Sequence, residues 1–190
     1  MSRSDRITSE CASERCSAGD ARAVEQQLGR PARGVQAVAH RCPCGLPDVV
    51  ETLPRLPNGA PFPTLFYLTC PRASAAVSRL EAEGLMREQS ARLAADADLR
   101  AAHGRAHEDY LRRRDELAET GGVGPVPEIA GISAGGMPDR VKCLHVLLAH
   151  ALAAGPGVNV LGDEVRDLLE PWWHRGPCVD YSNSTAEEPS

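Results

Sequence analysis

The segment VLLAHALAAG, residues 146–155, is apolar apart from one histidine, His150. A helix that is apolar on nearly all sides cannot lie on a protein surface. Asp139 is a suitable N-cap residue and Gly155 a suitable C-terminal stop, so we expect a helix over 139–154. We further expect the other elements to bury this helix on most of its sides.

The region 35–70 favours β-strands. Its last part, TLFYLTC, is rich in β-branched and aromatic residues, and the pair Asn58-Gly59 is a strong signal for a hairpin turn. The expected strands lie within residues 34–42, 48–56 and 64–70. Such closely spaced strands with short turns indicate a small antiparallel sheet.

The residues that follow favour helices. A short helix over 23–29 precedes the sheet, and after it we expect helices over 71–84, 85–96 and 97–119 and a last one from about 162. In the helix from Pro71, one face carries Ala73, Ala76, Val77, Leu80 and Glu81. The sequence thus predicts an α+β fold, with a small antiparallel sheet (about 35–70) packed against a helical layer (about 71–170).

Length and composition indicate one domain, over residues 23–179, with polar tails at 1–22 and 180–190 that we expect to be disordered. The net charge of −5 argues against a nucleic-acid partner. The N-terminus has no apolar signal region, and no apolar run reaches the length that spans a membrane. We therefore expect a cytoplasmic protein without a membrane span.

Seven cysteines in a reducing compartment are typical of free thiols, metal ligands or catalytic groups. Cys11 and Cys16 lie in the expected N-terminal tail and are predicted to be free. The others lie at turns and near helix starts, where a thiolate is favoured. We expect a metal centre, either zinc or an iron–sulfur cluster, with the ligands Cys42, Cys44, Cys70 and Cys143. Substitute ligands are Cys178, His40 and His145; burial of the thiols as small apolar side chains is the alternative.

A second hypothesis is a cysteine-dependent enzyme that acts on an anionic or phosphorylated substrate. Cys143 would be the nucleophile and His145 or His150 the base. The glycine-rich loop before the central helix would offer backbone N–H groups to the anion through Gly135 and Gly136, with Arg140 nearby.

Other histidines and aromatic residues leave further alternatives open. His103 and His107 are four residues apart on the long helix and could share a ligand, although a polar helix face explains them as well. Trp172 and Trp173 are expected to cover the core. A third hypothesis, a non-catalytic scaffold for division proteins, would use these tryptophans or the long helix.

Several blocks of the sequence occur in the same order in a known family. They are HRCPCGLPDVVETLPRLPNGAPFPTLFYLTCP, SRLEAEGLM, AHEDYLRRR, SAGGMPDRVKCLHVLLAHALAAGPGVN and the C-terminal GPC. In these blocks the chain, from about Val24 to Val179, resembles the uncharacterised, mainly actinobacterial domain-of-unknown-function family 501; Val160 stands where the family has proline.

This resemblance implies a cytosolic α+β domain and brings no established activity. Family members are often encoded near a septum-initiator protein of the division apparatus and an exopolyphosphatase. The resemblance therefore implies two kinds of partner, a division-apparatus protein and a phosphate-bearing small molecule. It also implies that the thiols of Cys42, Cys44, Cys70, Cys143 and Cys178, together with His145, belong together.

Overall fold

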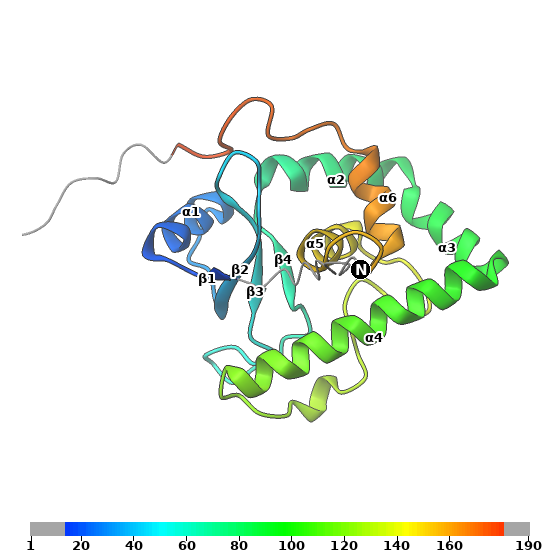
Figure 1. Cartoon of the computed structure of the whole chain (residues 1–190), viewed down its shortest axis with the longest axis horizontal. Helices are drawn as coiled ribbons and strands as arrows, with labels where there is room; N and C mark the ends of the chain where they lie inside the picture. The colour runs from blue at the N-terminus through cyan, green and yellow to red at the C-terminus, as the bar shows by residue number, and fades with distance from the viewer. Residues whose placement is uncertain (1–13, 181–190) are drawn as a thin grey trace, which may run out of the picture.

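The computed structural model describes residues 14–180 and confirms the α+β fold (Figure 1). The strands are β1 (Glu14–Arg15), β2 (Val35–Arg41), β3 (Pro47–Thr52) and β4 (Phe66–Leu68). The α-helices are α1 (Ala18–Leu28), α2 (Pro71–Glu83), α3 (Leu85–Ala95), α4 (Ala97–Thr120), α5 (Leu144–Ala154) and α6 (Val160–Leu168), and a 3-10 turn lies at Pro127–Ile129. None of the described helices is both long and apolar enough to cross a membrane.

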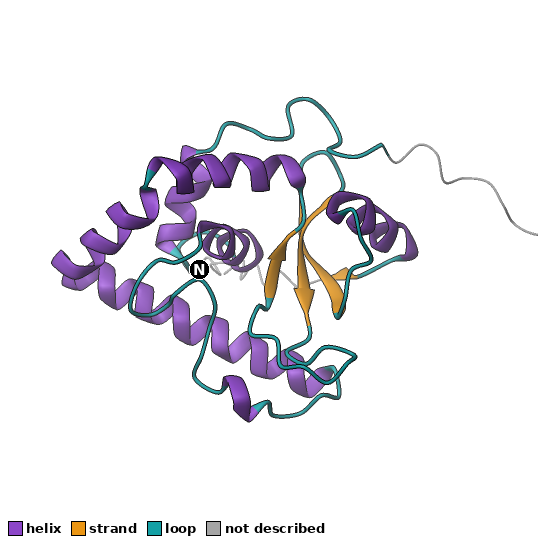
Figure 2. Cartoon of the chain, turned by 180° about the vertical axis from the view of Figure 1, so that it is seen from behind, coloured by secondary structure: helices purple, strands orange, loops and turns teal. Residues whose placement is uncertain are grey.

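The four strands form one antiparallel sheet in the order β1-β2-β3-β4. The predicted hairpin turn is present between β3 and β4, where Gly59 has a φ of 82° and its N–H donates to the carbonyl of Leu56. Helix α1 covers one face of the sheet, and α5 covers the other (Figure 2). Strand β3 is therefore buried on both faces, which explains its nearly continuous run of buried residues.

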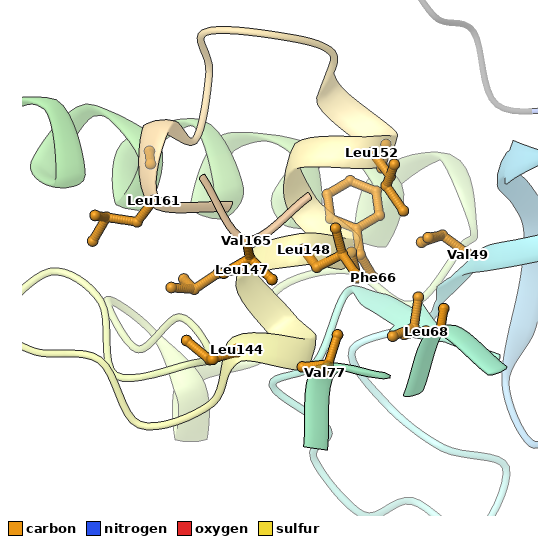
Figure 3. Packing of buried hydrophobic residues seen from close by; sticks show 14 of the residues in the cluster. Val49, Phe66, Leu68, Val77, Leu144, Leu147, Leu148, Leu152, Leu161 and Val165 are labelled. Carbon is orange, nitrogen blue, oxygen red and sulfur yellow. The ribbon is translucent and has the colours of Figure 1, made fainter. Parts of the chain in front are cut away.

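Helix α5 lies in the middle of the core, as the sequence predicts. Eight of its eleven residues are buried. Leucines of α5 meet Phe66 and Leu68 of β4 on one side and Leu161 and Val165 of α6 on the other (Figure 3). The close approach of α6 depends on Gly162, because a Cβ atom there would lie 2.1 Å from the carbonyl oxygen of Leu147.

The polar member of α5, His150, is fully buried and has a partner at each ring nitrogen. Nε2 lies 3.0 Å from a carboxylate oxygen of Asp109 in α4, and Nδ1 lies 3.2 Å from the side-chain amide of Asn159. The carboxylate can only accept, so Nε2 carries the proton and Nδ1 accepts from the amide. The imidazole also stacks on Phe66, with ring centroids 5.6 Å apart.

The ends of two helices differ from the sequence-based expectation. Helix α5 begins at Leu144, with Cys143 as its N-cap, rather than after Asp139. Two hydrogen bonds hold the preceding segment out of the helix: Val141 N–H donates to Ser90 Oγ of α3, and Lys142 N–H donates to the carbonyl of Gly135 in the preceding loop. Tertiary contacts therefore override the local signal.

At the N-terminus the regular structure begins earlier than expected. Strand β1 starts at Glu14 and α1 at Ala18, within the predicted tail 1–22. Ser17 and Asp20 form a reciprocal capping box, and Arg41 of β2 makes two hydrogen bonds to Asp20, of 2.7 and 3.0 Å. Cys11, the rest of this tail and residues 181–190 lie outside the described residues, whereas Asp180 has no regular structure.

We predict that Asn159→Ala lowers the free energy of unfolding by about 2–3 kcal/mol, because it removes both the cap of α6 and the partner of buried His150. Asp96→Ala is the matched control: Asp96 also caps a helix, α4, but in an exposed position, and should cost about 1 kcal/mol. Chemical denaturation measures both, and equal losses would contradict the role given to His150.

A second prediction concerns acid stability. The ion pair with Arg41 lowers the pKa of Asp20 from 3.8 to about 2. Because the pKa in the folded state is depressed, the pair stabilises the fold above about pH 4 and is lost as the pH falls toward about 2. Asp20→Asn should therefore lower stability by about 1 kcal/mol at neutral pH and flatten its pH dependence between these values. Glu25→Gln, on the exposed face of α1, should do neither.

Candidate metal centre

Cys143 and His145 are brought together by the way α5 begins. Cys143 is the N-cap residue and has an extended backbone (φ −156°, ψ 114°). The sequence-based expectation placed Cys143 inside the helix, where side chains two residues apart diverge. Because Cys143 is extended instead, its sulfur lies 3.9 Å from Nδ1 of His145. The two side chains therefore share one site.

Helix α2 adds a carboxylate to this pair. Oε1 of Glu81 accepts a hydrogen bond of 2.8 Å from the first backbone N–H of α5, that of Leu144. The same oxygen lies 3.2 Å from Nδ1 of His145. A carboxylate at a helix N-terminus is also favoured by the helix dipole. Glu81 is thus fixed at the site by the backbone and by the histidine.

Glu81, Cys143 and His145 each present one ligand atom, and these atoms all lie within 4.8 Å of one another. Within residues 14–180 this is the only group of three or more histidine, cysteine or acidic side chains that is so compact. A thiolate, an imidazole and a carboxylate form a donor set that zinc accepts. The three side chains are partly buried, at the boundary between core and solvent.

The second ring nitrogen of His145, Nε2, contacts residues of α2 on the side away from Cys143 and Glu81. Nε2 lies 3.1 Å from the backbone carbonyl of Ser74 and 3.4 Å from the hydroxyl of Ser78. A carbonyl can only accept, so Nε2 carries a proton. Metal-bound histidines commonly donate their other N–H in this way, which fixes the ring orientation. Nδ1 is therefore the nitrogen that faces the site.

Without a metal ion, Nδ1 also faces hydrogen-bond acceptors. The hydrogen bond with Cys143 and the charge of Glu81 together outweigh burial and raise the pKa of His145 to about 9. The ring is then a cation between a carboxylate and a sulfur atom. A metal ion at this point would take the place of the proton on Nδ1 and would leave the bond to Ser74 intact.

A cavity opens next to this group, between β4, α2 and the start of α5. It has a volume of about 280 Å³ and is lined by Thr64, Phe66, Tyr67, Leu68, Ser74, Cys143, His145 and Val146. Two of the three side chains, Cys143 and His145, thus face the open space. In catalytic zinc sites such a space lets a water or a substrate take the fourth position beside three protein ligands.

The other predicted metal ligands lie elsewhere. Cys42 and Cys44 interact with each other in the β2–β3 turn, and Cys70 interacts with Cys178 of the C-terminal segment. His40 binds Asp48, with 2.6 Å between Nδ1 and the carboxylate oxygen. The structure therefore groups Cys143 with His145, a predicted substitute ligand, and with Glu81, which the sequence analysis did not propose as a ligand.

The residues of the enzyme hypothesis are only partly brought together. His145 contacts Cys143, whereas His150 has both ring nitrogens occupied in the core and does not line the cavity. Gly135 and Gly136 accept backbone hydrogen bonds from residues 140–142, and the first N–H of α5 is taken by Glu81. These contacts account for the conformation of the glycine-rich loop without a bound anion. An anion site formed by Gly135, Gly136 and Arg140 therefore stays a prediction.

The two histidines of the long helix differ in their surroundings. His103 is fully buried, and neither of its ring nitrogens has a hydrogen-bond partner among the described residues, whereas Nδ1 of His107 lies 2.8 Å from the hydroxyl of Ser133. Neither histidine belongs to the compact group of ligands. Trp172 is buried in the core cluster, and Trp173 packs against it, as predicted.

Comparison with known families decides which family the chain belongs to. The model of DUF501, described as a protein of unknown function, matches residues 38–167, about two thirds of the 190 residues. The chain is a member of the DUF501 family. The part that matches DUF501 includes Glu81, Cys143 and His145 and ends before Cys178. No curated protein and no solved structure matches the chain.

Proposed function

We propose that this DUF501 protein binds one divalent metal ion, best matched by zinc, through Glu81, Cys143 and His145. The observation that carries the proposal is the compactness of the three ligand atoms, all within 4.8 Å of one another, together with the open cavity beside them. Zinc accepts sulfur, nitrogen and oxygen ligands in one tetrahedral site, whereas magnesium and calcium prefer oxygen alone.

The surroundings of the three side chains support this proposal. Leu144 N–H orients the carboxylate of Glu81, and the carbonyl of Ser74 orients the ring of His145. Such outer partners raise the affinity of a metal site because they fix the ligands before the ion binds. The ligands come from two helices that the core holds in place, so little order has to be created on binding.

The cavity supports a catalytic rather than a purely structural role. A zinc ion with an open position supplies an activated water or polarises a carbonyl or phosphoryl group. The walls of the cavity include the apolar side chains of Phe66, Leu68 and Val146, which exclude water from one side. The reaction class that fits this site is metal-assisted hydrolysis of a small substrate with an apolar part.

Metal analysis of purified variants tests the proposal. Cys143→Ser and His145→Gln should each lose about one equivalent of zinc per chain relative to the unmodified protein, because three-ligand sites bind weakly once a ligand is removed. Ser78→Ala is the matched control, since Ser78 contacts the same histidine without being a ligand and should keep the metal. Circular dichroism verifies that each variant is folded. Unchanged zinc content in both ligand variants would refute the proposal.

A second candidate function is thiol chemistry at Cys143. Its supporting observation is the contact between the sulfur and a histidine whose raised pKa keeps it protonated at neutral pH. A thiolate next to a histidine cation is the nucleophile of many cysteine enzymes. In this case the cavity would hold the electrophile, and no metal would be required.

Alkylation with iodoacetamide separates the two candidates. In metal-free protein, Cys143 should react about tenfold faster than Cys16, whose pKa is raised by burial and by Asp20. Added zinc should slow the reaction of Cys143 about tenfold or more and leave Cys16 unchanged if the metal proposal holds, because a bound thiolate is no longer free to attack. Rapid alkylation that zinc does not slow would favour the thiol enzyme. Peptide mapping by mass spectrometry measures each rate.

A further inference from the structure

Four further cysteines gather at one end of the sheet. Cys42 and Cys44 lie in the turn between β2 and β3, Cys70 is the N-cap of α2 directly after β4, and Cys178 lies in the C-terminal segment. Antiparallel pairing brings the β2–β3 turn and the end of β4 to the same edge, because Pro47 pairs with Arg41 and Thr69 N–H donates to the carbonyl of Asp48. Figures 1 and 2 show the C-terminal segment passing the same end.

The four thiols form two interacting pairs. The pairs are Cys42 with Cys44 and Cys70 with Cys178. Cys42 and Cys70 are buried, whereas Cys44 and Cys178 are partly buried. All four sulfur atoms belong to the core cluster or pack against it. These thiols are therefore neither scattered nor fully exposed.

A side-chain hydrogen-bond donor points at one of the sulfur atoms. Cys178 receives a hydrogen bond of 3.3 Å from the side-chain amide of Gln27. Donors of this kind stabilise a thiolate, which is the form of cysteine that binds metal ions.

One side chain connects the two pairs. The amide of Gln27 donates both to Cys178 and, at 2.7 Å, to the carbonyl of Pro47, which lies next to the Cys42–Cys44 turn. The carbonyl oxygen of the Gln27 side chain is buried and has no hydrogen-bond partner among the described residues. Arg72 of α2 also holds the C-terminal segment, because its guanidinium donates a hydrogen bond of 2.8 Å to the carbonyl of Gly176, two residues before Cys178.

We propose that Cys42, Cys44, Cys70 and Cys178 form a second metal centre, with four thiolate ligands, that is separate from the Glu81 site. The ion would displace the thiol protons and link the β2–β3 turn, the start of α2 and the C-terminal segment. No three of these sulfur atoms lie within 4.8 Å of one another in the structure, so binding draws the two pairs together. Around a single zinc ion, bonds of about 2.3 Å place the sulfur atoms about 3.8 Å apart.

Two kinds of metal centre use four thiolate ligands. A single zinc ion requires all four sulfur atoms to meet at one point. An iron–sulfur cluster with two irons requires only that each iron holds one pair, with sulfide between the irons. Both assign the same four cysteines, and analysis of iron, zinc and inorganic sulfide in protein purified without oxygen distinguishes them.

The experiment uses the full chain with the first site disabled by Cys143→Ser and His145→Gln. This double variant should retain one zinc ion, or iron with sulfide, per chain. Adding Cys42→Ser or Cys178→Ser should remove that metal, whereas adding Cys16→Ser, the matched control at a thiol outside the cluster, should not. The metal equivalent that the double variant loses relative to the unmodified protein therefore belongs to the Glu81 site. The equivalent that the added cysteine substitutions remove belongs to the second centre.

Cobalt provides a readout that does not depend on the variants. The unmodified protein, freed of metal and reloaded with Co²⁺, should show the strong sulfur-to-metal absorption of several thiolates, well above that of the single thiolate at Cys143. A folded double variant that binds no metal would overturn the proposal. So would a disulfide between Cys70 and Cys178 in protein purified without oxygen, because oxidised sulfur is no longer a ligand.

Discussion

The burial of His150 is the constraint on which the arrangement of the helices depends. Burying an imidazole in an apolar helix costs free energy unless its ring nitrogens have hydrogen-bond partners. Asp109 and Asn159 supply them from α4 and from the residue that caps α6. Burial alone would raise the pKa of Asp109, yet its hydrogen bonds to His150 and Arg112 keep that pKa below its ordinary value. One polar side chain thereby fixes α4, α5 and α6 relative to one another.

With α5 fixed in this way, the position of its first turn is determined. The start of the helix lies against α2 and beside β4, where Cys143, His145 and Glu81 meet. The proposed metal site is thus attached to a helix that is buried in the core. Rigid support of this kind keeps ligands at their bonding distances.

Local patterns in the sequence were sufficient for much of the fold. The apolar run 146–155, the strand-rich region before Cys70 and the glycine that separates α2 from α3 each carry a signal within a few residues. The start of α5 could not be predicted, since it depends on Ser90, about fifty residues earlier in the chain. The early start of α1 could have been predicted, because Ser17 and Asp20 have the spacing of a capping box.

The candidate site was less accessible to sequence reasoning. Thiol placement near helix starts pointed to Cys143 but could not decide whether its neighbours are other cysteines or His145, because the pairing is set by tertiary contacts. Cys178, for example, meets Gln27 across 151 positions of sequence. A usable signal for Glu81 was present: it is the charged member of an otherwise apolar face of α2. A carboxylate in such a position needs a partner inside the protein.

Helix α2 links the two proposed centres. Cys70 caps its N-terminus, and Glu81 lies near its C-terminus, about 16 Å further along the axis at 1.5 Å per residue. Ser74, which holds His145, lies between them. One continuous helix therefore carries residues of both proposed centres, with no loop between them.

The two tryptophans of the chain give the protein a built-in optical probe. Trp172 and Trp173 are adjacent, with ring centroids 4.8 Å apart at an interplanar angle of 83°, and Trp172 lines a hollow next to Arg72 and Ala76 of α2. All indole fluorescence therefore originates in the segment that leads to Cys178. The emission spectrum therefore reports whether this segment lies against α2. A conformational change in the sheet or in α4 alters the spectrum only when it also moves this segment.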